Sequence, residues 1–256
     1  MDFEVTSGTT KIRGAFHPAS SSQSPCIIVC HGMPAGPRPV AAGVDDQGND
    51  GLSYEEIAQL FSGLGIATVI FNFRGTGAST GDYHPMGWVE DLQQVITWVQ
   101  GRPEIDSARL GIMGSSMGAV IAIKVASGRD DIRFLVTYAS PSSISRPVDV
   151  SAQIDRYRVL GIITTMGFPD NAEEWAQEFE NIDPGYHIGK VTSDHVLLVH
   201  GDADDVVPVD ALTELFGLAP PHAELRIVKG AGHRFRSEPR SIEIISDWIG
   251  EIFSEE

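Results

Sequence analysis

Short apolar runs alternate with helix-forming segments along most of the chain, and this alternation restricts the fold more than any other feature of the sequence. Six runs are mostly apolar, are rich in β-branched residues and end near glycine, serine or polar residues: 26–30, 66–72, 109–113, 133–139, 195–201 and 224–230. Such runs predict strands that are covered on both faces, as in parallel sheets. Strands and helices in regular alternation favour an α/β fold with a doubly wound, mostly parallel sheet.

The segments between these runs carry helix signals. Ser53 and Glu56 have capping-box spacing, and the helix that they begin is expected to end at Gly65. Apolar residues recur at helical spacing over 88–100 and again near the C-terminus. Two further stretches, 2–6 and 11–17, predict a hairpin at the edge of the sheet. A chain of 256 residues is long enough for one such α/β domain.

Two segments interrupt the alternation. Residues 33–52 form a long loop without periodicity, and a loop of this length in a compact domain is typically functional or disordered. Residues 141–194 are longer than one crossover helix requires. We expect 1–140 and 195–256 to form the core, with 141–194 as a small helical lid over the carboxyl ends of the strands. Its apolar side chains are expected to line a substrate pocket, with Leu160, Ile163, Met166, Phe168 and Trp175 as the candidates.

Two stretches match the G-x-S-x-G pattern of a nucleophilic serine, "GASTG" at 77–81 and "GSSMG" at 114–118. A nucleophile elbow requires a buried strand before the serine and a helix directly after it. The sequence around Ser116 meets both requirements, because an apolar strand runs into Gly114 and an apolar helix follows Gly118. Ser79 lies several residues beyond its strand and is followed by loop-forming residues. We therefore assign Ser116 as the candidate nucleophile and Ser79 to a loop.

A serine nucleophile needs a base, and the base needs an acid to orient it. His233 lies in a glycine-flanked loop, "GAGH", between the last strand and the last helix, which brings it to the edge of the sheet where ligands gather. The other seven histidines are expected to have structural roles. Three carboxylates directly follow the strand at 195–201, and spacing alone does not choose among Asp202, Asp204 and Asp205.

These motifs together resemble the α/β-hydrolases over nearly the whole chain. The resemblance is carried by "HGM" at 31–33, "NFRGTGASTG" at 72–81, "GSSMG", "HGDADDVVP" at 200–208 and "GAGH". It points to the group of small esterases and of enzymes similar to dienelactone hydrolase or to serine aminopeptidases. The resemblance implies Asp204 as the acid, with Asp202 as the alternative, and it implies a structural role for the loop that contains Ser79.

Two backbone N–H groups are expected to form an oxyanion hole. One belongs to Met117, the residue after the nucleophile, and the resemblance places the other at Met33. The expected reaction is the hydrolysis of short-chain, medium-chain or aryl carboxylic esters through an acyl-enzyme on Ser116. The alternatives are an aminopeptidase, a lactone or C–C bond hydrolase with the same triad, and a non-catalytic small-molecule receptor.

Charge and composition indicate the kind of partner. The formal charge of −17 opposes binding to nucleic acid and to anionic membranes, so a small-molecule ester is the expected partner. No dinucleotide motif is found, and "DDQGND" at 45–50 departs from a calcium loop, so we expect neither a cofactor nor a metal. Cys26 and Cys30 lie too far apart on one strand for a disulfide. With no recognisable signal peptide or membrane span, these features favour a cytoplasmic protein. The sequence does not determine the oligomeric state, and a homo-oligomer is one alternative.

Overall fold

The computed structural model describes residues 1–34 and 51–254, so most of the 33–52 loop and the rejected calcium segment at 45–50 lie outside the described residues. The strands are β1 (Asp2–Ser7), β2 (Thr10–His17), β3 (Ser24–Cys30), β4 (Ala67–Asn72), β5 (Ile105–Ser115), β6 (Phe134–Tyr138), β7 (His195–Gly201) and β8 (Glu224–Val228). The α-helices are α1 (Tyr54–Gly63), α2 (Pro85–Gln100), α3 (Met117–Ala126), α4 (Val150–Val159), α5 (Ala172–Asn181), α6 (Pro184–His187), α7 (Asp210–Leu218) and α8 (Pro239–Ser254). Two short 3₁₀ turns, η1 (Ile188–Lys190) and η2 (Phe235–Ser237), complete the described elements.

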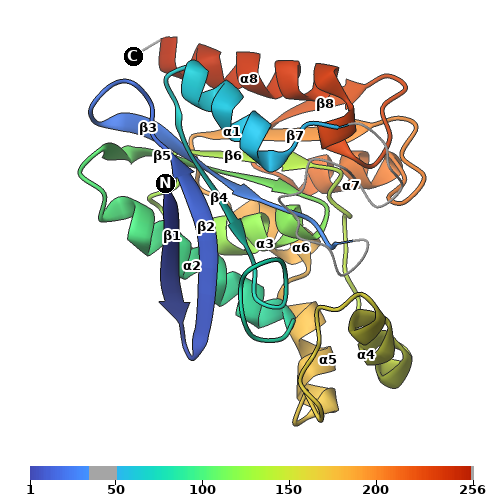
Figure 1. Ribbon diagram of the computed structural model, residues 1–256. Helices are drawn as coiled ribbons and strands as arrows, with labels where there is room; N and C mark the ends of the chain where they lie inside the picture. The colour runs from blue at the N-terminus through green and yellow to red at the C-terminus, as the bar shows by residue number, and fades with distance from the viewer. Residues whose placement is uncertain (35–50, 255–256) are drawn as a thin grey trace.

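The eight strands form one sheet in the order β1-β2-β4-β3-β5-β6-β7-β8 (Figure 1). β2 pairs antiparallel with both β1 and β4, and every other neighbouring pair is parallel. This arrangement confirms the predicted edge hairpin and the doubly wound, mostly parallel sheet. The strand order reverses direction around β3, and the carboxyl ends of the central parallel strands therefore meet at one edge.

Two hydrophobic clusters cover the two faces of the sheet. α1 and α8 pack on one face, with Ile27 and Val29 of β3 among the buried side chains. α2, α3 and α7 pack on the other face, to which Cys26, Ile28 and Cys30 point. The strands at the centre of the sheet are buried on both sides because successive side chains alternate between these clusters. Both cysteines are free and buried, as predicted, and burial raises the pKa of each thiol well above its ordinary value.

The segment between β6 and β7 contains α4, α5 and α6. In Figure 1, α4 and α5 project beyond the end of the sheet. Their inner faces are buried through Ile154, Tyr157, Trp175 and Phe179, which join the same cluster as α2. The described part of the chain has no helix that is both long and apolar enough to cross a membrane. The division into a core and a lid stays a prediction.

Candidate active site

Ser116 lies at the sharp turn between β5 and α3, as the motif predicts. Its backbone angles are φ +52° and ψ −121°, and it is one of three non-glycine residues with positive φ in the described chain. Such a conformation costs on the order of 1–3 kcal/mol unless the surroundings enforce it. The N–H of Ser116 donates to the carbonyl of Tyr138 at 2.9 Å, and its own carbonyl accepts from the N–H of Ala119 at 2.9 Å. The strand before and the helix after thus hold the serine in a strained position.

Two glycines make this turn sterically accessible. A Cβ on Gly114 would lie 2.4 Å from the carbonyl oxygen of Gly118. A Cβ on Gly118 would lie 2.4 Å from the carbonyl oxygens of both Cys30 and His31. Each of these contacts is with backbone, which moves much less readily than a flexible side chain. The glycine spacing of the motif therefore reflects close packing of β5, α3 and the end of β3.

His233 lies within hydrogen-bonding distance of both Ser116 and Asp204. The Ser116 Oγ is 3.0 Å from the His233 Nε2, and the His233 Nδ1 is 2.9 Å from the Asp204 Oδ2. The carboxylate accepts, so Nδ1 carries the proton and Nε2 is left to accept from the serine hydroxyl. The Asp204 side chain is fully buried and that of His233 is 16% exposed. This chain of contacts suits the transfer of the serine proton to the imidazole.

The three carboxylates that follow β7 differ in their surroundings. Asp204 points inward, and its Oδ1 accepts from the N–H groups of Val206 and Val207 at 2.9 and 2.8 Å. Asp202 and Asp205 are exposed. Asp202 accepts from the N–H of Gly230 rather than from His233. Of the three, Asp204 is the residue that the structure brings to the imidazole, in agreement with the family resemblance.

The loop after β3 passes directly over the turn at Ser116. A Cβ on Gly32 would lie 3.1 Å from the Cβ of Ser116, and Met33 and Met117 are both partly buried beside this contact. The predicted oxyanion donors therefore come from segments that flank the serine, and their role stays a prediction. His31 supports this loop, because its Nδ1 lies 2.7 Å from the Gly32 carbonyl and its Nε2 accepts from the N–H of Phe73 at 3.2 Å. Burial lowers the pKa of His31 from 6.5 to about 4.

The candidate pocket residues of the 141–194 segment occupy different environments. Ile163 and Trp175 are buried, and the Trp175 Nε1 donates to the carbonyl of Tyr83 at 3.2 Å. Leu160 and Phe168 are partly buried against the core, whereas Met166 is 98% exposed. A cavity of about 640 Å³ lies elsewhere, and its described lining comes from β1, β2, β3, β4, α1, His31 and Ala78. The predicted contribution of the five residues to a substrate pocket stays a prediction.

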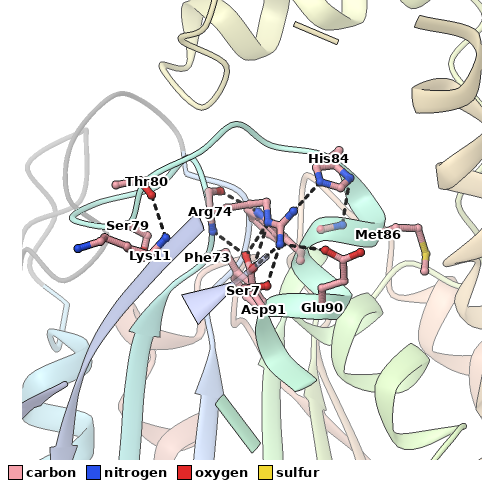
Figure 2. A network of polar contacts seen from close by, with 12 residues as sticks. Ser7, Lys11, Phe73, Arg74, Ser79, Thr80, His84, Met86, Glu90 and Asp91 are labelled. Atoms are coloured by element: carbon pink, nitrogen blue, oxygen red, sulfur yellow. Dashed lines mark hydrogen bonds and ion pairs between the residues drawn. The ribbon is translucent and has the colours of Figure 1, made fainter. Parts of the chain in front are cut away.

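The loop between β4 and α2 is fastened by a buried network that is centred on Arg74 (Figure 2). The Arg74 guanidinium contacts the fully buried carboxylate of Asp91 at 2.7 Å, as well as Ser7 and Glu90. Asp91 also accepts from the backbone N–H of Arg74 at 2.8 Å. Asp91 thus tethers this loop to α2.

The same network connects this loop to α5, which the sequence did not indicate. The Arg74 Nη1 lies 2.6 Å from the His84 Nε2, and the His84 Nδ1 lies 3.0 Å from the Glu178 Oε2. Glu178 also accepts from the backbone N–H of Met86 at 2.9 Å. Glu178 therefore binds the start of α2 through its carboxylate. In the sequence, Glu178 looks like the other glutamates of α5. Only the packing of α5 on α2 gives it a different environment.

A second connection that the sequence did not indicate joins the turn at Ser116 to the loop of His233. The carbonyl of Tyr138 accepts from Ser116, as described above, and the Tyr138 hydroxyl donates to the carbonyl of Gly232 at 2.9 Å. One residue at the end of β6 thus contacts both loops.

In the described residues, no group of three histidine, cysteine, aspartate or glutamate side chains is arranged to hold a metal ion.

Comparisons with known proteins agree with this architecture. The family model of the prolyl oligopeptidase family matches residues 52–255. The uncharacterized protein Rv2307c of Mycobacterium tuberculosis is 25% identical over 227 residues, which cover 87% of this chain and 68% of that protein. YfhR of Escherichia coli K12, also uncharacterized, is 25% identical over 73% of this chain and 57% of its own length.

Solved structures show the same fold. DcsB, in complex with its substrate analogue, superposes with a TM-score of 0.74 at 20% identity, covering 98% of this chain and 99% of DcsB. Est1E of Butyrivibrio proteoclasticus, with ferulic acid bound, gives a TM-score of 0.71 at 18% identity, covering 99% of this chain and 98% of Est1E. The α/β hydrolase GrgF of Penicillium gives 0.73 at 18% identity, covering 98% and 97%. The chain has the α/β-hydrolase fold, and it belongs to the prolyl oligopeptidase family.

Proposed function

We propose that the protein is a serine hydrolase that cleaves carboxylic esters through an acyl-enzyme on Ser116. The observation that carries this proposal is the contact chain from the Ser116 Oγ to the His233 Nε2 and from the His233 Nδ1 to Asp204, built on a strained elbow. A serine on an ordinary loop needs neither the strain nor the buried carboxylate. This combination is the arrangement that activates a weak nucleophile.

The proposed reaction has two steps. In the first, Ser116 attacks the acyl carbonyl while His233 takes its proton, and His233 then gives that proton to the departing alcohol. In the second, water attacks the acyl-enzyme, His233 takes a proton from the water, and the acid leaves as Ser116 regains its proton. The N–H groups of Met33 and Met117 stabilise the oxyanion in both steps. Asp204 holds the imidazole in the required tautomer and stabilises its protonated form.

The state of the acidic side chains on α5 favours esters over substrates with a free amine. A peptidase that reads an amino terminus needs an available carboxylate near the site. Three of the four glutamates on α5 have side-chain partners, namely Glu173 with Arg146, Glu178 with His84 and Glu180 with Gln177, and the fourth, Glu174, is exposed. The net charge of −17 also suits a neutral or apolar substrate better than an anionic polymer. Among the similar structures, one is described as an esterase of Pyrococcus furiosus and another as Est1E with ferulic acid bound.

An aminopeptidase is the second candidate, because the matching family is that of the prolyl oligopeptidases. A panel of p-nitrophenyl esters of graded chain length, measured alongside aminoacyl-anilides, separates the two activities. We expect kcat/KM for the better esters to exceed that for every anilide. Faster hydrolysis of an anilide would replace the esterase assignment with the peptidase one.

Labelling with a fluorophosphonate tests the nucleophile itself. We expect the mass of one adduct on the peptide that contains Ser116 and none on the peptide that contains Ser79. The variant His233→Ala should label at least tenfold more slowly, because the hydroxyl loses its base. An absence of adduct from the folded wild-type protein would favour a non-catalytic receptor.

A further inference from the structure

A second histidine, His200, lies behind the carboxylate of Asp204. It is the residue before the last of β7, and its side chain is 1% exposed. Its Nε2 lies 2.9 Å from the carbonyl oxygen of Val207 and 3.2 Å from the Asp204 Oδ2. Asp204 therefore lies between two imidazoles, with His233 on the side of the serine and His200 on the side of the core.

The contacts of His200 determine its tautomer. The Val207 carbonyl only accepts hydrogen bonds, so the Nε2 of His200 must carry the proton. Its N–H donates to the Val207 carbonyl, and the same nitrogen lies 3.2 Å from the Asp204 Oδ2. The Nδ1 of the neutral ring has no proton, and this atom is buried with no hydrogen-bond partner among the described residues.

N–H groups consequently lie beside both oxygens of the Asp204 carboxylate. Oδ1 accepts from the N–H groups of Val206 and Val207, and Oδ2 accepts from His233 and lies 3.2 Å from the His200 Nε2. Three hydrogen bonds and this polar contact leave the carboxylate little freedom to rotate, so Oδ2 stays aligned with the His233 Nδ1.

A polar ring with an unpaired buried nitrogen is costly at a position where an apolar side chain would pack. Leu198, two residues earlier on the same face of β7, is apolar and fully buried. We infer that His200 is a positioning residue, which fixes the orientation of Asp204 and through it the tautomer of His233. This inference rests on the proposed function, since the orientation matters only if His233 acts as a base.

Two amide substitutions isolate the N–H group that His200 places beside Asp204. The amide nitrogen of glutamine reaches the position of the imidazole Nε2, whereas that of asparagine reaches the position of Nδ1. With p-nitrophenyl acetate, we expect His200→Asn to lower kcat about 10- to 100-fold, because the N–H group beside the charged carboxylate is lost. KM should stay within about twofold of the wild-type value, and His200→Gln should recover most of kcat.

A matched control is available on the surface of the molecule. The His222 Nε2 also lies 2.9 Å from a backbone carbonyl, that of Ser193, but His222 does not contact Asp204. His222→Asn should leave kcat and KM unchanged. Equal losses in His200→Asn and His200→Gln, or a wild-type kcat in His200→Asn, would overturn the positioning role.

NMR of the ¹⁵N-histidine-labelled wild-type protein tests the inference even if the His200→Asn variant fails to fold. We expect the Nε2–H tautomer for His200, and an Nδ1–H tautomer at that residue overturns the inference. The fluorophosphonate experiment keeps the two hypotheses apart. Wild-type protein without an adduct on Ser116 contradicts the proposed function, whereas normal labelling together with an unaffected His200→Asn variant contradicts only the role of His200.

Discussion

Residues 77–81 and 114–118 share one pattern of glycine and serine, yet their two serines have entirely different partners. The Ser79 Oγ donates to the carbonyl of Asn72 at 2.5 Å and accepts from the N–H of Arg13 at 2.9 Å. The Ser116 Oγ faces the His233 Nε2 at 3.0 Å. The hydroxyl of Ser79 is thus used to fasten a loop to the sheet, whereas that of Ser116 contacts a group that can remove its proton.

The glycines of the two segments also serve different purposes. Gly77 has φ +50°, and the atoms nearest to a Cβ there would belong to the side chain of Asn72. At Gly114 and Gly118 a Cβ would meet backbone atoms at 2.4 Å. The first glycine permits a turn, and the other two permit strand, helix and loop to pass at close range. The G-x-S-x-G pattern therefore indicates a catalytic serine only when that serine lies at a strained turn between a strand and a helix.

The largest expected difference between the two segments is in activity. Ser116→Ala should reduce kcat/KM for p-nitrophenyl esters by at least about 1,000-fold, because the nucleophile is removed. Ser79→Ala should retain wild-type kinetics and lose about 1 kcal/mol of unfolding free energy, since two hydrogen bonds to the backbone are removed. Steady-state kinetics and urea unfolding measure both effects. Near-wild-type activity in Ser116→Ala would end the assignment.

The next effect is on the stability of the loop that contains Ser79. Asp91→Ala should lower the unfolding free energy by about 3–5 kcal/mol, because it leaves the buried Arg74 guanidinium without its main counter-ion. The double variant Arg74→Met/Asp91→Leu should recover most of this loss. Asp106→Ala removes a partly exposed pair with Arg109 and should cost less than about 1 kcal/mol. Equal losses for Asp91→Ala and Asp106→Ala would show that the buried pair does not fasten the loop.

Close packing at the elbow predicts a slightly smaller effect. Gly118→Ala should destabilise the protein by about 3 kcal/mol, because the new Cβ would lie 2.4 Å from two carbonyl oxygens of the chain after β3. Gly63→Ala is the matched substitution in the last turn of α1, where a Cβ meets nothing within 4 Å. It should leave stability unchanged or raise it by about 0.5–1 kcal/mol. Thermal unfolding of both variants tests this contrast.

The smallest effect concerns His31. Its ring contacts Gly32, which lies beside Ser116, and Phe73, which lies between β4 and the segment 77–81. Burial lowers its pKa to about 4, the positive charge of Arg236 adds to this effect, and the hydrogen bond to Gly32 opposes it. Between about pH 6.5 and pH 4 the unfolded chain binds a proton that the folded protein excludes. Stability should therefore fall as the pH falls through this window, by up to about 3 kcal/mol from this residue.

Urea unfolding of the wild-type protein and of His31→Gln at pH 7 and pH 4.5 measures this contribution. Carboxylates titrate in the same window in both proteins, so the difference between their two pH dependences reports His31. The wild-type protein should lose more stability than the variant. Identical pH dependences would contradict a neutral, buried His31.

Several features follow from local patterns and could be predicted. The strand at 195–201 was expected with its observed bounds, because its apolar run is uninterrupted. Ser116 and His233 were expected at the same sheet edge, because both follow parallel strands. The choice of Asp204 over Asp202 and Asp205 required the family resemblance, since all three directly follow one strand. The Glu178–His84 contact joins residues 94 positions apart, and no local pattern relates them.

The sequence by itself determined the alternation of strands and helices, the elbow at Ser116 and the segments from which a base and an acid must come. These features depend on periodicity, on glycine spacing and on the direction of parallel strands, all of which are local. Only the tertiary structure decided that the Tyr138 hydroxyl contacts the loop of His233, that Glu178 binds the start of α2 and that His200 contacts Asp204. These contacts depend on how elements far apart in the chain pack together, and hydrogen bonds require an accuracy of a few tenths of an ångström that residue patterns do not encode.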